Sequence, residues 1–154
     1  MTDRETKVGF ASVVRCGLGK HDEVDPNKYR TSGDVILSAV AADSPVRHVF
    51  DRCTEHFLKE LPGDVRAVVF LGLDEDYVEA LFERMRQLHP SLRRISPLAY
   101  ETDRVTFVHV MHPSPQATNH RRAWLSDERS GLSDKRHEVL RALGLARLQP
   151  ANLG

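Results

Sequence analysis

The feature of this chain that most constrains its fold is an alternation of short apolar runs with amphipathic stretches. Two runs rich in β-branched residues, Ala67–Gly72 and Arg104–Met111, follow a third run at Val8–Val14, and segments with helical spacing separate them. The run at 67–72 contains no polar side chain, as expected for a strand covered on both faces. The order strand, helix, strand, helix, strand predicts right-handed crossovers between parallel strands. We therefore predict an α/β fold, a three-layer sandwich with a short, mostly parallel sheet flanked by helices.

Two helices are predicted from their caps and their apolar spacing. The first opens at Ser44-Pro45, where serine can cap and proline gives up only an unpaired N–H, and it stops at Pro62-Gly63. Its apolar positions are Val46, Val49, Phe50, Cys53, Phe57 and Leu61. The second follows Asp74, a favourable N-cap residue. Its buried stripe is predicted to be Tyr77, Leu81, Met85 and Leu88. Ahead of both helices, Lys20 to Ser32 is predicted to be a surface loop and Asp34 to Ala42 a short helix.

Composition narrows the class of protein. A chain of 154 residues suits one compact domain. Lys+Arg and Asp+Glu are both 22, and this balance argues against a non-specific nucleic-acid coat while leaving room for a local basic patch. No apolar run approaches the roughly 20 residues of a membrane-spanning helix, and the polar start at Met1 does not read as a signal peptide. We expect a cytoplasmic protein with no membrane partner.

The segment with the strongest candidates for a functional site follows the last predicted strand. In open α/β sheets ligands bind beyond the carboxyl ends of the strands, which here are Arg15-Cys16, Leu71–Leu73 and Met111-His112. The third of these continues as His112-Pro113-Ser114-Pro115-Gln116, in which two prolines hold the backbone in a stiff, extended turn. From the residues alone, this segment is either a rigid strand-to-loop turn or a ligand-binding element that presents the His112 imidazole.

The segment resembles the second signature motif of the uracil-DNA glycosylase superfamily, in which His-Pro-Ser-Pro follows a buried strand. The continuation to Trp124 is most similar to the single-strand-selective monofunctional branch of that family. Three upstream segments resemble the family's second strand, the following helix and the third strand: Phe10–Cys16, Cys53–Leu58 and Ala67–Gly72. The resemblance covers most of residues 8 to 143 in the correct order. It implies one glycosylase-like domain over residues 1–154, lacking the family's N-terminal motif strand.

The resemblance implies hydrolysis, without a cofactor, of the N-glycosidic bond of a damaged base flipped out of DNA. It assigns His112 to catalysis, because an imidazole against the carbonyl oxygen of the departing pyrimidine stabilises the negative charge that develops there. Ser12 and Gly72, near the ends of other strands, are expected to contact the substrate. The residues expected to contact DNA, through the minor groove and the phosphates, are Pro113, Ser114, Pro115, Gln116, Arg121 and Arg122.

Three departures from the family pattern bear on activity. The family's first motif, Gly-x-Asp-Pro, which positions the attacking water, is absent; the carboxylates at Asp74–Asp76 lie at a strand end, but helix capping and the helix dipole explain them better than a substitute role in catalysis. Ser12 stands where the family commonly has an asparagine, and a hydroxyl lacks the paired donor and acceptor that read a pyrimidine edge. The absent strand belongs in the middle of the sheet, so its loss leaves two unpaired edges. Another segment, a partner chain or a missing N-terminal part of a longer protein would have to fill that gap.

The sequence is also compatible with other functions. The chain is alternatively a non-catalytic member that binds DNA or a nucleotide, a truncated fragment of a glycosylase, or an unrelated α/β protein with a chance proline-rich turn. Cys16 and Cys53 resemble two of the four ligands in the iron–sulfur glycosylases, but a cluster normally needs four thiolates. We therefore expect two buried free thiols and no metal site.

Overall fold

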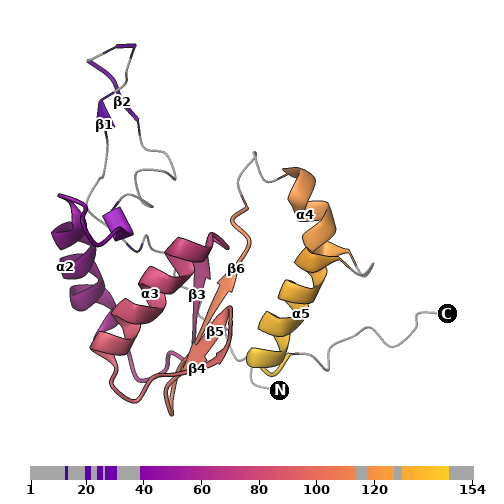
Figure 1. Cartoon of the computed structure of the whole chain (residues 1–154). Coiled ribbons are helices and arrows are strands. Elements are labelled where there is room, and N and C mark those ends of the chain that lie inside the picture. Colours follow the sequence, from indigo (N-terminus) through magenta and orange to yellow (C-terminus); the bar gives the residue numbers. More distant parts are fainter. Residues whose placement is uncertain are drawn as a thin grey trace, which may run out of the picture. The chain divides into compact units, whose positions relative to one another are not determined.

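A computed structural model gives the fold of most of the chain (Figure 1). It describes residues 13, 20, 21, 24, 25, 27–30, 39–113, 118–126 and 130–145. They belong to two compact units, residues 1–57 and 58–154, and each unit is treated by itself. Of the strand predicted at Val8–Val14, Val13 alone is described, and it lies in a bend; of the helix predicted at 34–42, residues 39–42 are described, and Ala39 and Val40 are helical. Within the described ranges, no helix has the length and apolar character needed to cross a membrane.

The first unit contains a small antiparallel sheet and helix α2. Strand β1 (Lys20–His21) pairs with β2 (Tyr29–Arg30) inside the segment that was predicted to be a loop. Helix α2 covers Arg47–Leu58, within the predicted bounds. The helix begins later than the predicted start at Ser44-Pro45: the Ser44 hydroxyl accepts a hydrogen bond from the Val46 N–H at 3.3 Å and so holds the turn that leads into α2. The buried residues of α2 are Phe50, Cys53 and Thr54.

The second unit is built on a four-stranded sheet with the order β3-β6-β5-β4. Strand β3 (Ala67–Leu71) runs parallel to β6 (Thr106–Val110), while β5 (Ala99–Glu101) is antiparallel both to β6 and to β4 (Arg93–Ser96). The predicted α/β class is confirmed. The sheet was expected to be mostly parallel, whereas β3–β6 is the one parallel pair of this sheet in the described residues. The connections between β4, β5 and β6 are too short for a crossover, so these strands must reverse direction.

Helix α3 (Glu75–Leu88) covers one face of this sheet. Its N-cap is Asp74, whose carboxylate accepts from the Tyr77 N–H at 3.1 Å, as the sequence predicted. Its predicted stripe is confirmed at Tyr77, Leu81 and Met85, which are buried, while Leu88 is half-buried. The sheet face beneath α3 is an aromatic layer made of Phe70, Tyr100, Phe107 and His109.

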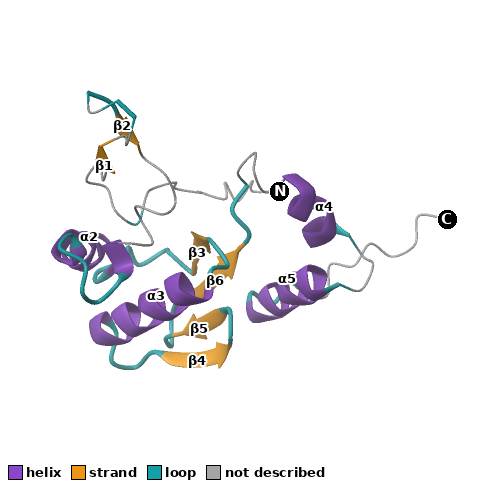
Figure 2. Ribbon diagram, turned by 45° about the horizontal axis from the view of Figure 1, so that its top comes forward, coloured by secondary structure: helices purple, strands orange, loops and turns teal. Residues whose placement is uncertain are grey.

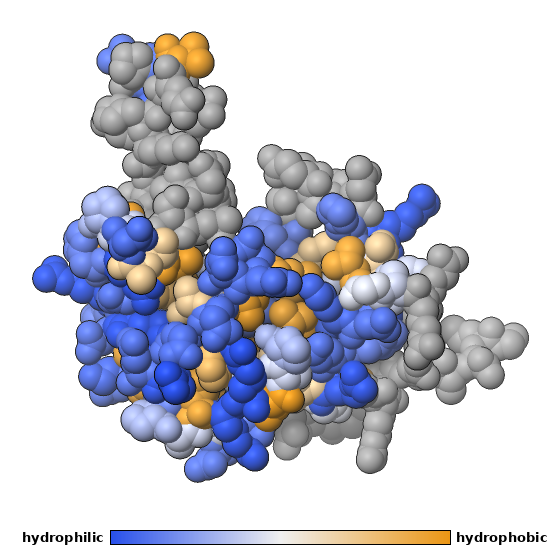
Figure 3. Space-filling view, in the orientation of Figure 1, coloured by the Kyte–Doolittle hydropathy of each residue, from blue (hydrophilic) through white to orange (hydrophobic). Residues whose placement is uncertain are grey.

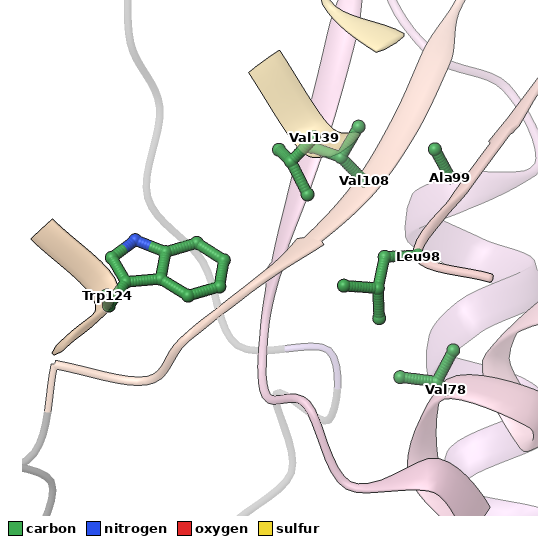
Figure 4. Close-up of a cluster of buried hydrophobic side chains, with 6 residues drawn as sticks. All are labelled: Val78, Leu98, Ala99, Val108, Trp124 and Val139. Atoms are coloured by element: carbon green, nitrogen blue, oxygen red, sulfur yellow. The ribbon is translucent and has the colours of Figure 1, made fainter. Parts of the chain in front are cut away.

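The opposite face of the sheet is covered by α5 (Gly131–Ala142), with α4 (Thr118–Leu125) packed beside it. Their side chains Trp124 and Val139 join a buried apolar cluster (Figure 4). Its other members are Val78, Leu98, Ala99 and Val108. Helix α5 begins with a reciprocal capping box between Ser130 and Ser133. Figure 2 shows α3 and α5 on opposite sides of the strands, so the predicted three-layer arrangement is present in this unit.

Candidate nucleic-acid interface

The carboxyl ends of β3 and β6 meet at one edge of the sheet, because the two strands are parallel neighbours. The Gly72 N–H continues their ladder by donating to the carbonyl oxygen of Val110 at 2.8 Å. Beyond Val110 the chain leaves the sheet: Met111 is half-buried, and His112 and Pro113 are exposed. His112 therefore stands in solvent at the end of a buried strand, at the strand-end edge where ligands of α/β sheets bind.

Helix α4 places three basic side chains near this edge. His120, Arg121 and Arg122 are exposed, while Trp124 turns inward to the apolar cluster. Met111 packs against the same cluster, so the same buried side chains contact both α4 and the strand end that carries His112. In the space-filling view, hydrophilic side chains lie next to apolar ones over α4 (Figure 3).

The end of α4 is also held in place. Arg136 of α5 donates from Nη1 to the Leu125 carbonyl oxygen at 2.8 Å. This carbonyl is one of the helix-terminal acceptors that have no partner within the helix itself. The indole anchor and the guanidinium bond together fix the orientation of α4, and hence the side from which its arginines project.

The strand-end edge has opposite charge on its two sides. After β3 the chain enters the first turn of α3, where Asp74, Glu75 and Asp76 are exposed. After β6 it leads to α4, with Arg121 and Arg122. Since α3 and the α4–α5 pair cover opposite faces of the sheet, a polyanion at this edge is attracted on the α4 side and repelled on the α3 side. The described charges therefore make the α4 side of this edge the more favourable one for a negatively charged ligand.

Gly72, predicted to contact the substrate, has a clear structural reason to be glycine. Its φ is +144°, a backbone conformation that side chains rarely adopt. A Cβ at this position would lie 2.9 Å from Cε1 of Tyr77. Gly72 thus lets β3 turn sharply into α3 beneath the Tyr77 ring, and its contact with a substrate stays a prediction.

A buried polar pair lies one step below the edge. His109 is fully buried, and its Nε2 and the Tyr100 hydroxyl are joined by a hydrogen bond of 3.1 Å. Burial lowers the pKa of His109 to about 4; the backbone of Gly72 acts in the opposite direction and the charge of Arg94 in the same direction, both less strongly. The other ring nitrogen, Nδ1, has no partner that satisfies both the distance and the angle of a hydrogen bond, so the Gly72 contact is a poorly aligned one.

The tyrosines around His109 are also held neutral. Burial raises the pKa of Tyr77 to about 12 and raises the pKa of Tyr100 well above its usual value. The ring of Tyr77 meets the His109 ring edge-on, with centroids 5.9 Å apart. This neutral cluster was not singled out from the sequence, although alternation along β6 places Phe107 and His109 on the same face.

The remaining predicted residues divide into two groups. Those that lie outside the described residues are Ser12, Cys16, Ser114, Pro115 and Gln116. Cys53 is described and is buried, as expected. Across the ranges that the structure describes, no group of three His, Cys, Asp or Glu side chains is placed to hold a metal ion.

Comparison with known proteins gives no match for this chain among family models, curated proteins or solved structures.

Proposed function

We propose that this chain is a uracil-DNA glycosylase-like, cytoplasmic DNA-repair protein that binds DNA across the strand-end edge of β3 and β6. The observation that carries the proposal is the exposed His112 at the end of buried β6, followed by the anchored basic helix α4. Arg121 and Arg122 would neutralise phosphates that flank a flipped nucleotide. The segment that starts at Pro113, predicted from its sequence to be a stiff turn, would press against the DNA backbone.

In this proposal His112 acts on the leaving base. When the N-glycosidic bond breaks, negative charge grows on the pyrimidine, and an imidazole N–H at its carbonyl oxygen stabilises that charge. The exposure of His112 in the free protein leaves it accessible to an incoming base, and bound DNA would then exclude water from it. In a site from which water is excluded, one hydrogen-bond donor of this type increases the reaction rate by about 10²–10³-fold.

A second candidate, DNA binding without cleavage, is favoured by the state of Asp74. This carboxylate is the nearest acid in sequence after β3, and it is engaged as the N-cap of α3. An acid held in this way is poorly placed to position an attacking water. The basic helix and the turn would still bind DNA, with an affinity that falls as salt rises.

A cleavage assay separates the two candidates. The purified chain is incubated with labelled single- and double-stranded oligonucleotides that contain one uracil, and alkali then reveals abasic sites. The glycosylase proposal predicts cleavage that is lost in His112→Ala and kept in His56→Ala, an exposed histidine of α2 that serves as the control. Cleavage that is equal in both variants would contradict the role of His112. Salt-sensitive binding without abasic sites would establish the second candidate in place of the first.

A further inference from the structure

A buried histidine connects the sheet to the turn that leads into α3. His109 lies on β6 and is fully buried, and its ring packs against Phe70 of β3 and Tyr77 of α3. The Tyr77 ring also lies close to Gly72, the residue at which β3 turns into α3. His109 and Gly72 thus share Tyr77 as a neighbour, at the place where the strand-end edge begins.

The group of Gly72 that faces His109 is its carbonyl oxygen. The Gly72 N–H is already used, because it donates to the Val110 carbonyl oxygen at 2.8 Å. The effect on His109 agrees: the Gly72 backbone raises the pKa of His109, as an acceptor does when it stabilises the protonated ring. The ring nitrogen that faces Gly72 is Nδ1, since Nε2 contacts the Tyr100 hydroxyl at 3.1 Å.

This carbonyl oxygen decides which ring nitrogen of neutral His109 carries the proton. A hydroxyl both donates and accepts, so Tyr100 can satisfy Nε2 in either tautomer, whereas a carbonyl oxygen can only accept. With the proton on Nε2, lone pairs of Nδ1 and of the Gly72 oxygen would face each other. Nδ1 is buried and has no well-aligned partner in the described part of the chain, so this tautomer would leave an unpaired acceptor in the core. With the proton on Nδ1, the same contact is attractive.

We propose that neutral His109 carries its proton on Nδ1 and directs it at the Gly72 carbonyl oxygen, while the Tyr100 hydroxyl donates to Nε2. The result is a chain of polar contacts from β5 through β6 to the turn between β3 and α3. His109 is then a positioning residue, which holds Gly72 and, through Gly72, the first turn of α3. The inference does not depend on the proposed function, because it concerns the free protein and neither His112 nor α4 takes part.

Nitrogen NMR of the histidine rings in the isotope-labelled chain tests the tautomer. His109 is neutral at neutral pH, because burial lowers its pKa to about 4. Its Nδ1 should carry a proton that exchanges slowly with water and gives cross-peaks to the α protons of Gly72, and its Nε2 should be unprotonated. Exposed His56 is the internal control, and its ring proton should exchange rapidly. A proton on Nε2 of His109 would overturn the proposal, and so would an Nδ1 proton without cross-peaks to Gly72.

Substitutions test whether this proton positions the turn. His109→Asn keeps an N–H donor near the place of Nδ1, whereas His109→Gln places its amide near that of Nε2. The backbone amide signals of Gly72 and Tyr77 should therefore stay close to those of the unmodified chain in His109→Asn and move in His109→Gln. Equal displacements in the two variants would contradict a positioning role.

Tyr100→Phe tests the same proposal with the histidine ring intact, and it applies even if neither His109 variant folds. The substitution removes the hydroxyl that contacts Nε2 and leaves the contact with Gly72 in place. The proton of His109 should then remain on Nδ1, because the Gly72 carbonyl oxygen is still its acceptor. A move of the proton to Nε2 in Tyr100→Phe would show that Tyr100 sets the tautomer, and would overturn the role assigned to Gly72.

Discussion

Gly72 is the residue whose backbone does most to shape the strand-end edge. Its φ of +144° and the 2.9 Å approach that a Cβ would make to the Tyr77 ring leave no room for a side chain. Gly72→Ala should lower the free energy of unfolding by about 1–3 kcal/mol, because the substitution adds backbone strain and a steric clash. Urea unfolding measures the change. Gly63→Ala is the control, since a Cβ there would have no neighbour within 4 Å; equal effects in the two variants would contradict this account of Gly72.

His109 should make the protein sensitive to mild acid. Its folded-state pKa is lowered to about 4 from an ordinary value of 6.5, so between these values the unfolded chain binds a proton that the folded chain does not. The folded state is therefore favoured above pH 6.5, and this contribution is lost as pH falls toward 4. The full loss is about 3 kcal/mol, at 1.36 kcal/mol for each pKa unit.

The measurement is the free energy of unfolding at several pH values between 7 and 4. Carboxylates also titrate toward pH 4, so variants are needed to isolate the contribution of His109. In His109→Leu combined with Tyr100→Phe, both hydrogen-bonding partners become apolar and no unpaired group is left. This double variant should lose less stability on acidification than the unmodified chain, by about the same 3 kcal/mol. His56→Leu, at an exposed histidine, should follow the unmodified chain. Identical pH dependence in all three proteins would mean that His109 is not the titrating group.

At the scale of elements, the strands and helices with strong periodicity were predictable and the short ones were not. The spacing of Tyr77, Leu81 and Met85, with Asp74 before them, was enough to place α3, and the apolar run at 67–71 was enough to place β3. Strands β4 and β5 were missed because Arg93-Arg94 and Glu101 interrupt any apolar alternation. Their stability comes instead from pairing across the sheet, which includes an ion pair between Arg93 and Glu101 at 2.7 Å.

Helices α4 and α5 were missed for a different reason. Each buries few residues: α4 contributes Trp124 to the core, and the buried residues of α5 are Ser133 and Val139. A stripe this sparse gives little helical periodicity. Ser130, the N-cap residue of α5, was the one local feature of the sequence that indicated a helix here. The exposed face of α4 was foreseen only through the resemblance that singled out Arg121 and Arg122.

The basic face of α4 leads to a prediction about salt dependence. Arg121→Ala and Arg122→Ala should each weaken DNA binding and reduce the slope of log K against log[salt] by about 0.7–0.9, the value for one lost phosphate contact. Arg86→Ala is the control, because Arg86 is exposed on α3 and paired with Glu83 at 2.6 Å. Binding isotherms at several salt concentrations measure the slopes. An equal change in the Arg86 variant would indicate non-specific electrostatics rather than a site on α4.

At the scale of the whole molecule, the distribution of charge bears on the proposed binding of DNA. The formal net charge is zero, with 22 basic and 22 acidic residues, so no general attraction draws the chain to DNA. What distinguishes the strand-end edge is its asymmetry, with acids at the start of α3 and arginines on α4. If the chain binds nucleic acid as proposed, binding through the basic face of α4 should therefore be weak but confined to a defined place.

The measurement that tests the account most directly is an NMR titration of the isotope-labelled chain with a uracil-containing single-stranded oligonucleotide. If DNA binds across the strand-end edge, signals of Met111, the His112 imidazole and residues 120–122 should shift together and saturate, while the His56 imidazole of α2 stays unchanged. Shifts confined to other parts of the chain, or none at oligonucleotide concentrations that saturate non-specific binding, would contradict the assignment of this edge as the nucleic-acid interface.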